Sequence, residues 1–146
     1  MANETQNFSN HKRNYPLFHF VAAPLLAIYL VYAIYSLVRA PSLETTMRLV
    51  LAAGAIATLF ASRVMAVTVQ NRVIRLEMTL RLQRVLGPVA AADALAKLPL
   101  GRLIALRFAS DAELPGLIAR VQSQELSTSA QVKQAIREWQ PDLLRA

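Results

Sequence analysis

The sequence contains no cysteine, only four glycines and two histidines, and just nine Asp and Glu residues in 146. The missing cysteines exclude disulfides, thiolate metal sites and cysteine nucleophiles. No glycine-rich phosphate loop and no serine–histidine–aspartate arrangement can be found. Asp111 and Glu113 are the only carboxylates within two residues of each other, and helix capping accounts for them. We therefore expect a protein that is not an enzyme and needs no cofactor or metal.

Positive charge predominates in what remains. The 16 Lys and Arg residues give a formal net charge of +7. They are spread over the whole chain and form no basic patch interleaved with aromatic residues, which disfavours nucleic-acid binding. A cytoplasmic surface beside anionic lipid explains such a charge better. We therefore expect membrane lipids, and not nucleic acid, as partners.

The chain is organised around residues 17–38, an apolar run of 22 residues without Asp, Glu, Lys or Arg. About 20 helical residues suffice to cross the hydrocarbon core of a bilayer. A second apolar run at 49–69 follows a loop at 40–46. The sequence thus predicts a membrane protein that is mainly α-helical, with a two-helix transmembrane hairpin and a small helical cytoplasmic domain. The expected divisions are a polar segment at 1–16, the hairpin at 17–70, and a juxtamembrane helix with the small domain at 71–146.

Basic residues near the hairpin predict its orientation. Six lie on the side of the termini and two lie in or beside the loop. The six are Lys12, Arg13, Arg72, Arg75, Arg81 and Arg84, and the two are Arg39 and Arg48. Because positive charge concentrates on the cytoplasmic side, we expect a multi-pass protein of the bacterial inner membrane with both termini in the cytoplasm.

The first span contains a proline and a row of tyrosines. Pro24 removes one backbone hydrogen bond, so we expect a kink near Phe20. Tyr29, Tyr32 and Tyr35 recur every three residues on roughly one face. A phenol in hydrocarbon needs a partner for its hydroxyl, which favours contact of this face with protein. Alternatively, Tyr35 lies at the far interface and Tyr29 bonds a nearby backbone carbonyl.

Small residues form two rows on the second span. One row is Ala53, Ala57 and Ala61, and the next is Gly54, Thr58 and Ser62. Such rows let two membrane helices approach closely. We expect them to pack on the first span.

One arginine and one histidine lie inside the predicted spans. Arg63 lies six residues before Val69, from where it can snorkel to the headgroups or pair with a partner subunit or a lipid phosphate. His19 is a candidate ligand for haem or a chlorophyll-type magnesium. An amphipathic ring in the interfacial aromatic belt is the simpler interpretation, because the hairpin contains no second histidine. We therefore expect no cofactor at His19.

Residues 73–84 allow two interpretations. Apolar residues alternate with polar ones, which is typical of a strand. Most of these residues are nevertheless helix formers, and Gly87-Pro88 is a typical helix stop. We favour a helix that continues out of the membrane, with a short β segment as the alternative. Apolar residues on several sides of this helix would need cover by the tail, lipid or a partner.

The remaining residues predict short helices. They are expected at 89–97, at 100–108, after the Ser110–Glu113 capping box, and at 129–140. Trp139 lies on the apolar stripe of the last helix, with Val132 and Ile136. It is expected either in the core with Phe108 or as the anchor for a partner.

The chain resembles an uncharacterised family of small bacterial two-span membrane proteins, known only as a domain of unknown function. The similarity lies in four stretches that occur in this order: QNFSNHKRNYPLFHF, QNRVIRLEMTLRL, ALRFASDAEL and VKQAIREWQPD. Together they cover nearly the whole chain, and Leu100-Gly101-Arg102 departs from the family pattern. The resemblance implies the two-span architecture and a bacterial origin, and it implies no activity.

Two functions remain open. The first is an accessory or scaffolding subunit of a larger bacterial membrane complex, for example photosynthetic or respiratory, with other membrane subunits as partners. The second is a free-standing membrane protein whose cytoplasmic domain binds lipid headgroups or a small ligand through Arg63, Arg72 and Arg75. The candidate contact residues for partner or lipid are Tyr29, Tyr32, Tyr35, Arg63, Arg72, Arg75 and Trp139.

Overall fold

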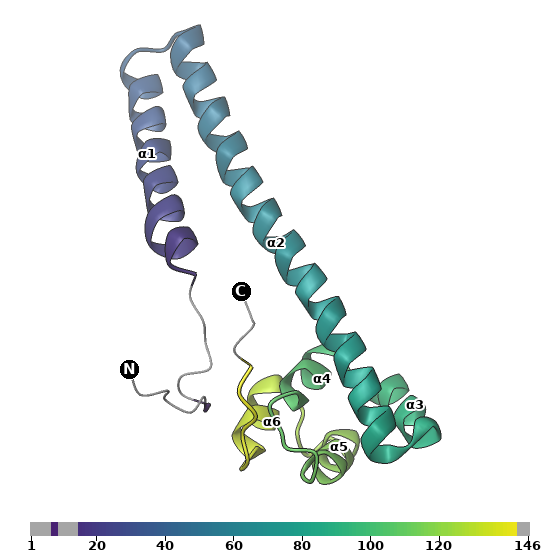
Figure 1. The fold of residues 1–146 in the computed structure, drawn as a ribbon. Helices are drawn as coiled ribbons and strands as arrows, with labels where there is room; N and C mark the ends of the chain where they lie inside the picture. The colour runs from purple at the N-terminus through teal and green to yellow at the C-terminus, as the bar shows by residue number, and fades with distance from the viewer. Residues whose placement is uncertain (1–6, 9–14, 143–146) are drawn as a thin grey trace. The chain divides into compact units, whose positions relative to one another are not determined.

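The structure is a computed structural model that describes residues 7–8 and 15–142. Helices and no strands make up its regular structure there (Figure 1). The order is the π-helix η1 (Leu17–Ala22), α1 (Ala23–Arg39), α2 (Leu43–Leu86), α3 (Pro88–Lys97), α4 (Leu100–Leu106), α5 (Leu114–Gln122) and α6 (Ser129–Ala135). The prediction of a mainly helical protein is therefore confirmed.

Contacts between residues divide the chain into two compact units. The boundary between them lies within α2, between Thr68 and Val69. We call the described residues 15–68 the hairpin unit. We call the described residues 69–142 the tail unit. Each unit is described by itself below.

The hairpin unit begins with an irregular helix. η1 is a π-helical segment, and Pro24 lies in the first turn of α1 directly after it. Proline cannot donate a backbone hydrogen bond, so the preceding turn departs from regular α geometry. The irregularity expected near Phe20 thus takes the form of a π-helical segment.

The loop of the hairpin is shorter than predicted. α1 ends at Arg39 and α2 already begins at Leu43. Ser42 and Thr45 cap α2 reciprocally: the Thr45 amide donates to Ser42 Oγ over 3.2 Å, and the Ser42 amide donates to Thr45 Oγ1 over 3.0 Å. Because this cap satisfies free amides at the helix start, three residues are enough to turn the chain.

Two helical stretches are long and apolar enough to cross a membrane by length and composition. One is η1 together with α1, and the other is α2, whose apolar part is its first half. Only 6% of the apolar stretch of each is buried. Large apolar side chains such as Phe20, Ile28, Val31 and Phe60 are more than 60% exposed.

The small residues of α2 do not pack as predicted. The buried alanines of the hairpin unit are Ala33 and Ala52, both fully inaccessible. Gly54 is exposed, and a Cβ added there would meet nothing within 4 Å. Ala57 is exposed as well. The expectation that these rows pack on the first span was wrong, because helical phase turns Ala52 inward and the neighbouring rows outward.

α2 continues without interruption through residues 73–84 and ends at Leu86. The short β segment considered for 73–84 was therefore wrong, and the continuing helix is confirmed. A strand would place even-numbered residues on one face, but Ile74, Met78 and Leu82 are buried while Leu76 and Leu80 are exposed. Burial at every fourth residue follows a helical period. Gly87, with a φ of +81°, then ends the helix, a backbone geometry that glycine adopts at no steric cost.

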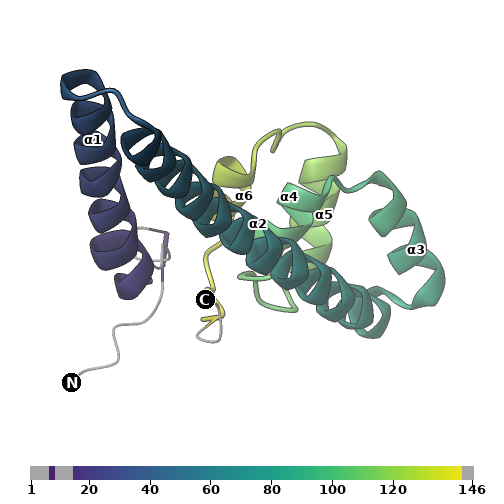
Figure 2. The same ribbon diagram turned by 90° about the horizontal axis from the view of Figure 1, so that it is seen from above.

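The tail unit packs its short helices on this last part of α2. α4, α5 and α6 pack against one another in both views (Figures 1 and 2). One apolar core joins them to α2 and α3. Its largest fully buried side chains are Phe108, Met78, Leu82, Leu103, Leu106, Leu114, Val121 and Val132.

The last helix is shorter than predicted. α6 ends at Ala135, and Ile136 is extended with a ψ of 126°. Trp139 instead pairs with Ala109 in an isolated antiparallel β-bridge, and the Gln140 amide donates to the Phe108 carbonyl oxygen over 2.7 Å. The extension of the last helix to residue 140 was therefore wrong.

Candidate functional site

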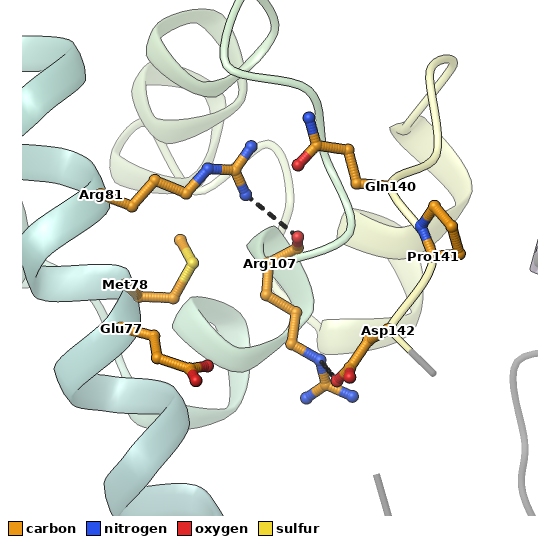
Figure 3. A pocket seen from close by; sticks show the side chains of 7 residues that line it. All are labelled: Glu77, Met78, Arg81, Arg107, Gln140, Pro141 and Asp142. Carbon is orange, nitrogen blue, oxygen red and sulfur yellow. Dashed lines mark hydrogen bonds and ion pairs between the residues drawn. The ribbon is translucent and has the colours of Figure 1, made fainter. Parts of the chain in front are cut away.

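A pocket of about 260 Å³ lies in the tail unit between α2, the end of α4 and the C-terminal segment (Figure 3). It is lined by Glu77, Met78, Arg81, Arg107, Gln140, Pro141 and Asp142. Two guanidinium groups and two carboxylates thus share one small space. The arrangement of their hydrogen bonds indicates what the site can do.

Arg81 connects α2 to the segment between α4 and α5. Its Nε lies 2.6 Å from Asp111 Oδ1, its Nη2 donates to the Ala109 carbonyl oxygen over 2.6 Å, and its Nη1 donates to the Arg107 carbonyl oxygen over 3.1 Å. Only 14% of the Arg81 side chain is exposed. Charge-assisted bonds of this kind are among the stronger hydrogen bonds in proteins. Arg81 therefore holds an irregular backbone segment in place.

Arg107 fixes the C-terminal segment from the opposite side of the pocket. Its Nε lies 2.9 Å from Asp142 Oδ2, and 8% of its side chain is exposed. Its guanidinium also lies 4.3 Å from the centre of the Phe108 ring. A buried charge needs such partners, since desolvation would otherwise disfavour it strongly. The ion pair with Asp142 and the ring of Phe108 supply them.

Glu113 binds the backbone of the two residues that follow Ile136, just after the end of α6. Its Oε1 accepts the Arg137 amide over 3.1 Å and its Oε2 accepts the Glu138 amide over 3.2 Å. A carboxylate that accepts two backbone amides replaces the helical hydrogen bonds that these residues would otherwise make. The extended course of the chain at Trp139 follows from this contact.

Trp139 lies on the edge of the core. It is half-buried and its ring centroid is 4.9 Å from that of Phe108, with a tilt of 32° between the rings. Phe108 itself is 1% exposed. The expected neighbourhood of Trp139 and Phe108 is present, although a β-bridge and not a helix brings Trp139 there.

The tyrosines of α1 meet arginines. Arg48 Nη1 donates to the Tyr32 hydroxyl over 3.2 Å, and the Arg39 guanidinium lies 5.5 Å from the centre of the Tyr35 ring. Tyr32 and Tyr35 are otherwise exposed, and Tyr29 is half-buried. The three tyrosines therefore do not form one buried face within the hairpin unit.

The arginine and the histidine of the predicted spans, Arg63 and His19, both lie near Phe18. The Arg63 guanidinium is 5.8 Å from the centre of the Phe18 ring. His19 packs edge-on against the same ring, with 5.0 Å between centroids, and its Nδ1 is 3.0 Å from the Tyr15 carbonyl oxygen. Since a carbonyl oxygen only accepts, Nδ1 carries the hydrogen of this bond. Among the described residues, no group of three or more His, Asp or Glu side chains is placed to hold a metal ion.

Arg72 and Arg75 are exposed and lie outside the pocket. Sequence reasoning selected them and missed the structural roles of Arg81, Arg107, Glu113 and Asp142. A signal for Arg81 was present: three residues after Met78 and one before Leu82, it borders the buried face of α2. The partners of Arg107 and Glu113 lie more than 20 residues away, and no local pattern indicates them.

These features define a mainly helical protein with two long apolar helices and a small helical domain whose loops are held by the largely buried side chains of Arg81 and Arg107. The chain belongs to a family of unknown function, DUF6526, which it matches over residues 1–146. No curated protein and no solved structure matches the chain.

Proposed function

We propose that the protein is a non-enzymatic integral membrane protein that serves as an accessory or scaffolding subunit of a larger bacterial membrane complex. In this proposal η1, α1 and the first half of α2 form a two-span transmembrane hairpin. The tail unit then forms a small domain at one membrane face. Photosynthetic and respiratory assemblies are examples of the host complex.

One observation carries the membrane part of the proposal. The apolar stretches of both long helices are only 6% buried. A core helix of a soluble protein would have most of such a stretch covered, because exposed apolar surface of this extent is unfavourable in water. A lipid bilayer supplies the missing cover, and the backbone hydrogen bonds of both helices are satisfied internally, as hydrocarbon requires.

The charged side chains support an orientation. Arg39 and Arg48 lie at the loop end, where they meet Tyr35 and Tyr32. Tyrosine and arginine together are typical of a membrane interface. Six basic residues on the other side, against these two, favour a cytoplasmic location for both termini and the tail unit.

The pocket supports a structural role in place of catalysis. Arg81 and Arg107 already hold Asp111 and Asp142. A guanidinium that maintains the fold in this way has little left to offer a substrate. Exposed apolar side chains on the tail unit, among them Leu76, Leu80 and Val89, offer surface for a protein partner.

The topology can be tested with the full-length chain, because it has no cysteine of its own. Ser42→Cys and Ser127→Cys should behave oppositely toward an impermeant thiol reagent on intact cells. We expect labelling at residue 42 at once and at residue 127 only after lysis. The protein should also stay in the membrane during alkaline carbonate extraction. Release by carbonate, or labelling of residue 127 alone on intact cells, would contradict the proposal.

The role as a subunit has its own test. The wild-type protein, extracted in a mild detergent, should migrate on a native gel with an assembly much larger than 16.1 kDa. Mass spectrometry of that band identifies the other subunits. Migration as an isolated monomer would exclude the accessory role.

Lipid headgroup binding is the second candidate, favoured by Arg72 and Arg75. Both are exposed, and neither side chain forms a hydrogen bond or ion pair with another described residue. Arg72→Gln/Arg75→Gln should then reduce the anionic lipid that copurifies with the protein. Arg137→Gln, exposed and remote in sequence, is the control that should leave the lipid content unchanged.

A further inference from the structure

We propose that a second copy of this chain packs on one exposed face of α2, with the two helices parallel. The face consists of Val69, Val73, Leu76 and Leu80, which we call the α2 stripe. The inference rests on the proposed function, because anchoring in one membrane gives both copies the same orientation.

The α2 stripe is apolar and uncovered within the tail unit. Val69, Val73, Leu76 and Leu80 are 60%, 50%, 61% and 60% exposed. On the same helix Ile74, Met78 and Leu82 are at most 5% exposed. At about 100° of rotation per residue, the stripe lies on the side of α2 opposite these core residues. The fold of the tail unit thus leaves this side of the helix open.

The spacing along the stripe matches a coiled-coil seam. The steps from Val69 to Leu80 are four, three and four residues. This places Val73 and Leu80 at heptad position a, and Val69 and Leu76 at position d. A β-branched residue at a followed by Leu at d favours a parallel two-stranded pair, and Val73 with Leu76 provides this combination.

The flanking charges argue for a second copy as the occupant. In this register Arg72 falls at position g and Glu77 at position e. Position g of one parallel helix faces the e position five residues later on its partner. Arg72 would therefore meet Glu77 of the other copy, and the contact would occur twice by symmetry.

Both charged residues are available for this contact. Arg72 and Glu77 are exposed, and neither side chain forms a hydrogen bond or ion pair with another described residue. An antiparallel pair would instead bring g toward g and e toward e, which sets Arg72 against Arg72 and Glu77 against Glu77. Like charges at these positions disfavour that arrangement.

The stripe is short, so anchoring matters for its strength. Residues 69–80 extend over only about 17 Å of helix. Two copies confined to one membrane meet at a high effective concentration, which lets a small contact surface suffice. We therefore expect a reversible dimer in the membrane that dissociates on dilution in detergent.

Cysteine cross-linking in native membranes tests the contact. The full-length cysteine-free chain receives Leu76→Cys at position d, or Arg75→Cys as a control at the neighbouring exposed position outside the seam. Mild oxidation should yield a disulfide dimer about five times more readily with Leu76→Cys than with Arg75→Cys. Equal yields from the two variants would overturn the proposal.

Charge reversal tests the choice of partner. In the Leu76→Cys background, Arg72→Glu or Glu77→Arg alone should lower the dimer yield about fivefold, as expected for the loss of two exposed ion pairs of about 0.5 kcal/mol each. The double variant Arg72→Glu/Glu77→Arg restores opposite charges across the pair, so the yield should recover. Absence of recovery, in a double variant that still resists carbonate extraction, would overturn the pairing of Arg72 with Glu77.

A photo-cross-linking amino acid at position 76 separates the other occupants. A product of twice the chain mass supports the proposal. A product with a different protein only would assign the stripe to another subunit, which refutes the dimer and preserves the proposed function. A product with lipid only would place the stripe against the membrane and refute the dimer. Release of the unmodified protein by carbonate would instead refute the proposed function itself.

Discussion

Arg81 holds Asp111 at 2.6 Å across 30 residues of sequence, and its guanidinium also donates to the carbonyl oxygen of Ala109. One side chain of α2 thereby fixes the segment that connects α4 with α5. The same segment forms the bridge to Trp139. The tail unit thus depends on an arginine that lies close to the apolar core and contributes no apolar contact area to it beyond its stem.

Replacement of this arginine should destabilise the tail unit strongly. Arg81→Ala leaves the Ala109 and Arg107 carbonyl oxygens without their donor, and we expect a loss of about 2–4 kcal/mol in the free energy of unfolding. Arg84→Ala is the matched control: Arg84 is 73% exposed and lies 3.5 Å from the same carboxylate, so its loss should cost less than about 0.5 kcal/mol. Pulse proteolysis of the full-length protein in detergent measures both. Equal effects would refute the special role of Arg81.

Removal of the Glu113 carboxylate should release the segment after α6. Glu113→Ala leaves the Arg137 and Glu138 amides without acceptors, at a cost of about 1–3 kcal/mol. Hydrogen exchange at these two amides should accelerate about 10- to 100-fold. Glu138→Ala, an exposed carboxylate on the same segment, should leave the exchange unchanged. Unaltered exchange in Glu113→Ala would show that the β-bridge alone holds the segment.

Trp139 should report its half-buried position in fluorescence, because it is the only tryptophan. We expect an emission shifted moderately to the blue and partly protected from a soluble quencher. Trp139→Ala should cost about 2 kcal/mol, less than the 3–5 kcal/mol typical of a fully buried aromatic. Trp139→Phe should retain most of the stability through contact with Phe108. Emission like that of free tryptophan in the purified protein would contradict the contact.

Leucine substitutions should distinguish the inner and outer faces of α2 in the hairpin unit. Ala52 is fully inaccessible, so Ala52→Leu should overpack the hairpin and cost about 1–3 kcal/mol. Gly54 faces open space, so Gly54→Leu should preserve the midpoint of thermal unfolding in detergent or raise it slightly, since leucine favours helix. A lower midpoint for Gly54→Leu than for Ala52→Leu would reverse this assignment.

The pair of Arg120 and Glu125 should be visible in an NMR titration. A hydrogen bond from Arg120 lowers the pKa of Glu125 below its ordinary value. A pKa lowered in the folded state stabilises the fold above the unfolded-state pKa, and this contribution is lost as the pH falls through the folded-state pKa. Arg120→Gln should raise the pKa of Glu125 toward its ordinary value, while Arg137→Gln should not change it. An unchanged pKa in Arg120→Gln would exclude the contact in solution.

Local signals in the sequence predicted most helix boundaries. The capping box predicted at Ser110–Glu113 was wrong, because Glu113 is itself the N-cap of α5 and its carboxylate accepts the Arg137 and Glu138 amides. Gly87-Pro88 nevertheless ended α2 as expected, and α6 begins at Ser129 as expected. These boundaries depend on backbone conformation and on caps a few residues away. Signals that act over a few residues can be recognised in the sequence itself.

Features that depend on distant residues were not predictable in the same way. The early end of α6 depends on Glu113, which lies 24 residues before Arg137. Small residues alone did not indicate which face of α2 turns inward in the hairpin unit, because several neighbouring rows qualify and, of residues 49–69, only Ala52 is buried. The pocket was missed for the same reason: its lining residues come from α2, from Arg107 just after α4, and from the C-terminal segment.

The bridge between Ala109 and Trp139 also sets an order for biosynthesis. Phe108 is enclosed by a segment that the ribosome adds about 30 residues later. Until residues 136–142 have been made, the ring of Phe108 lacks Trp139 and the guanidinium of Arg107 lacks Asp142. A nascent chain that has completed α1 to α5 therefore still exposes part of its core, and closure of the tail unit is a late event in synthesis. Chaperone contact or proteolysis of stalled chains should concentrate on this interval of synthesis.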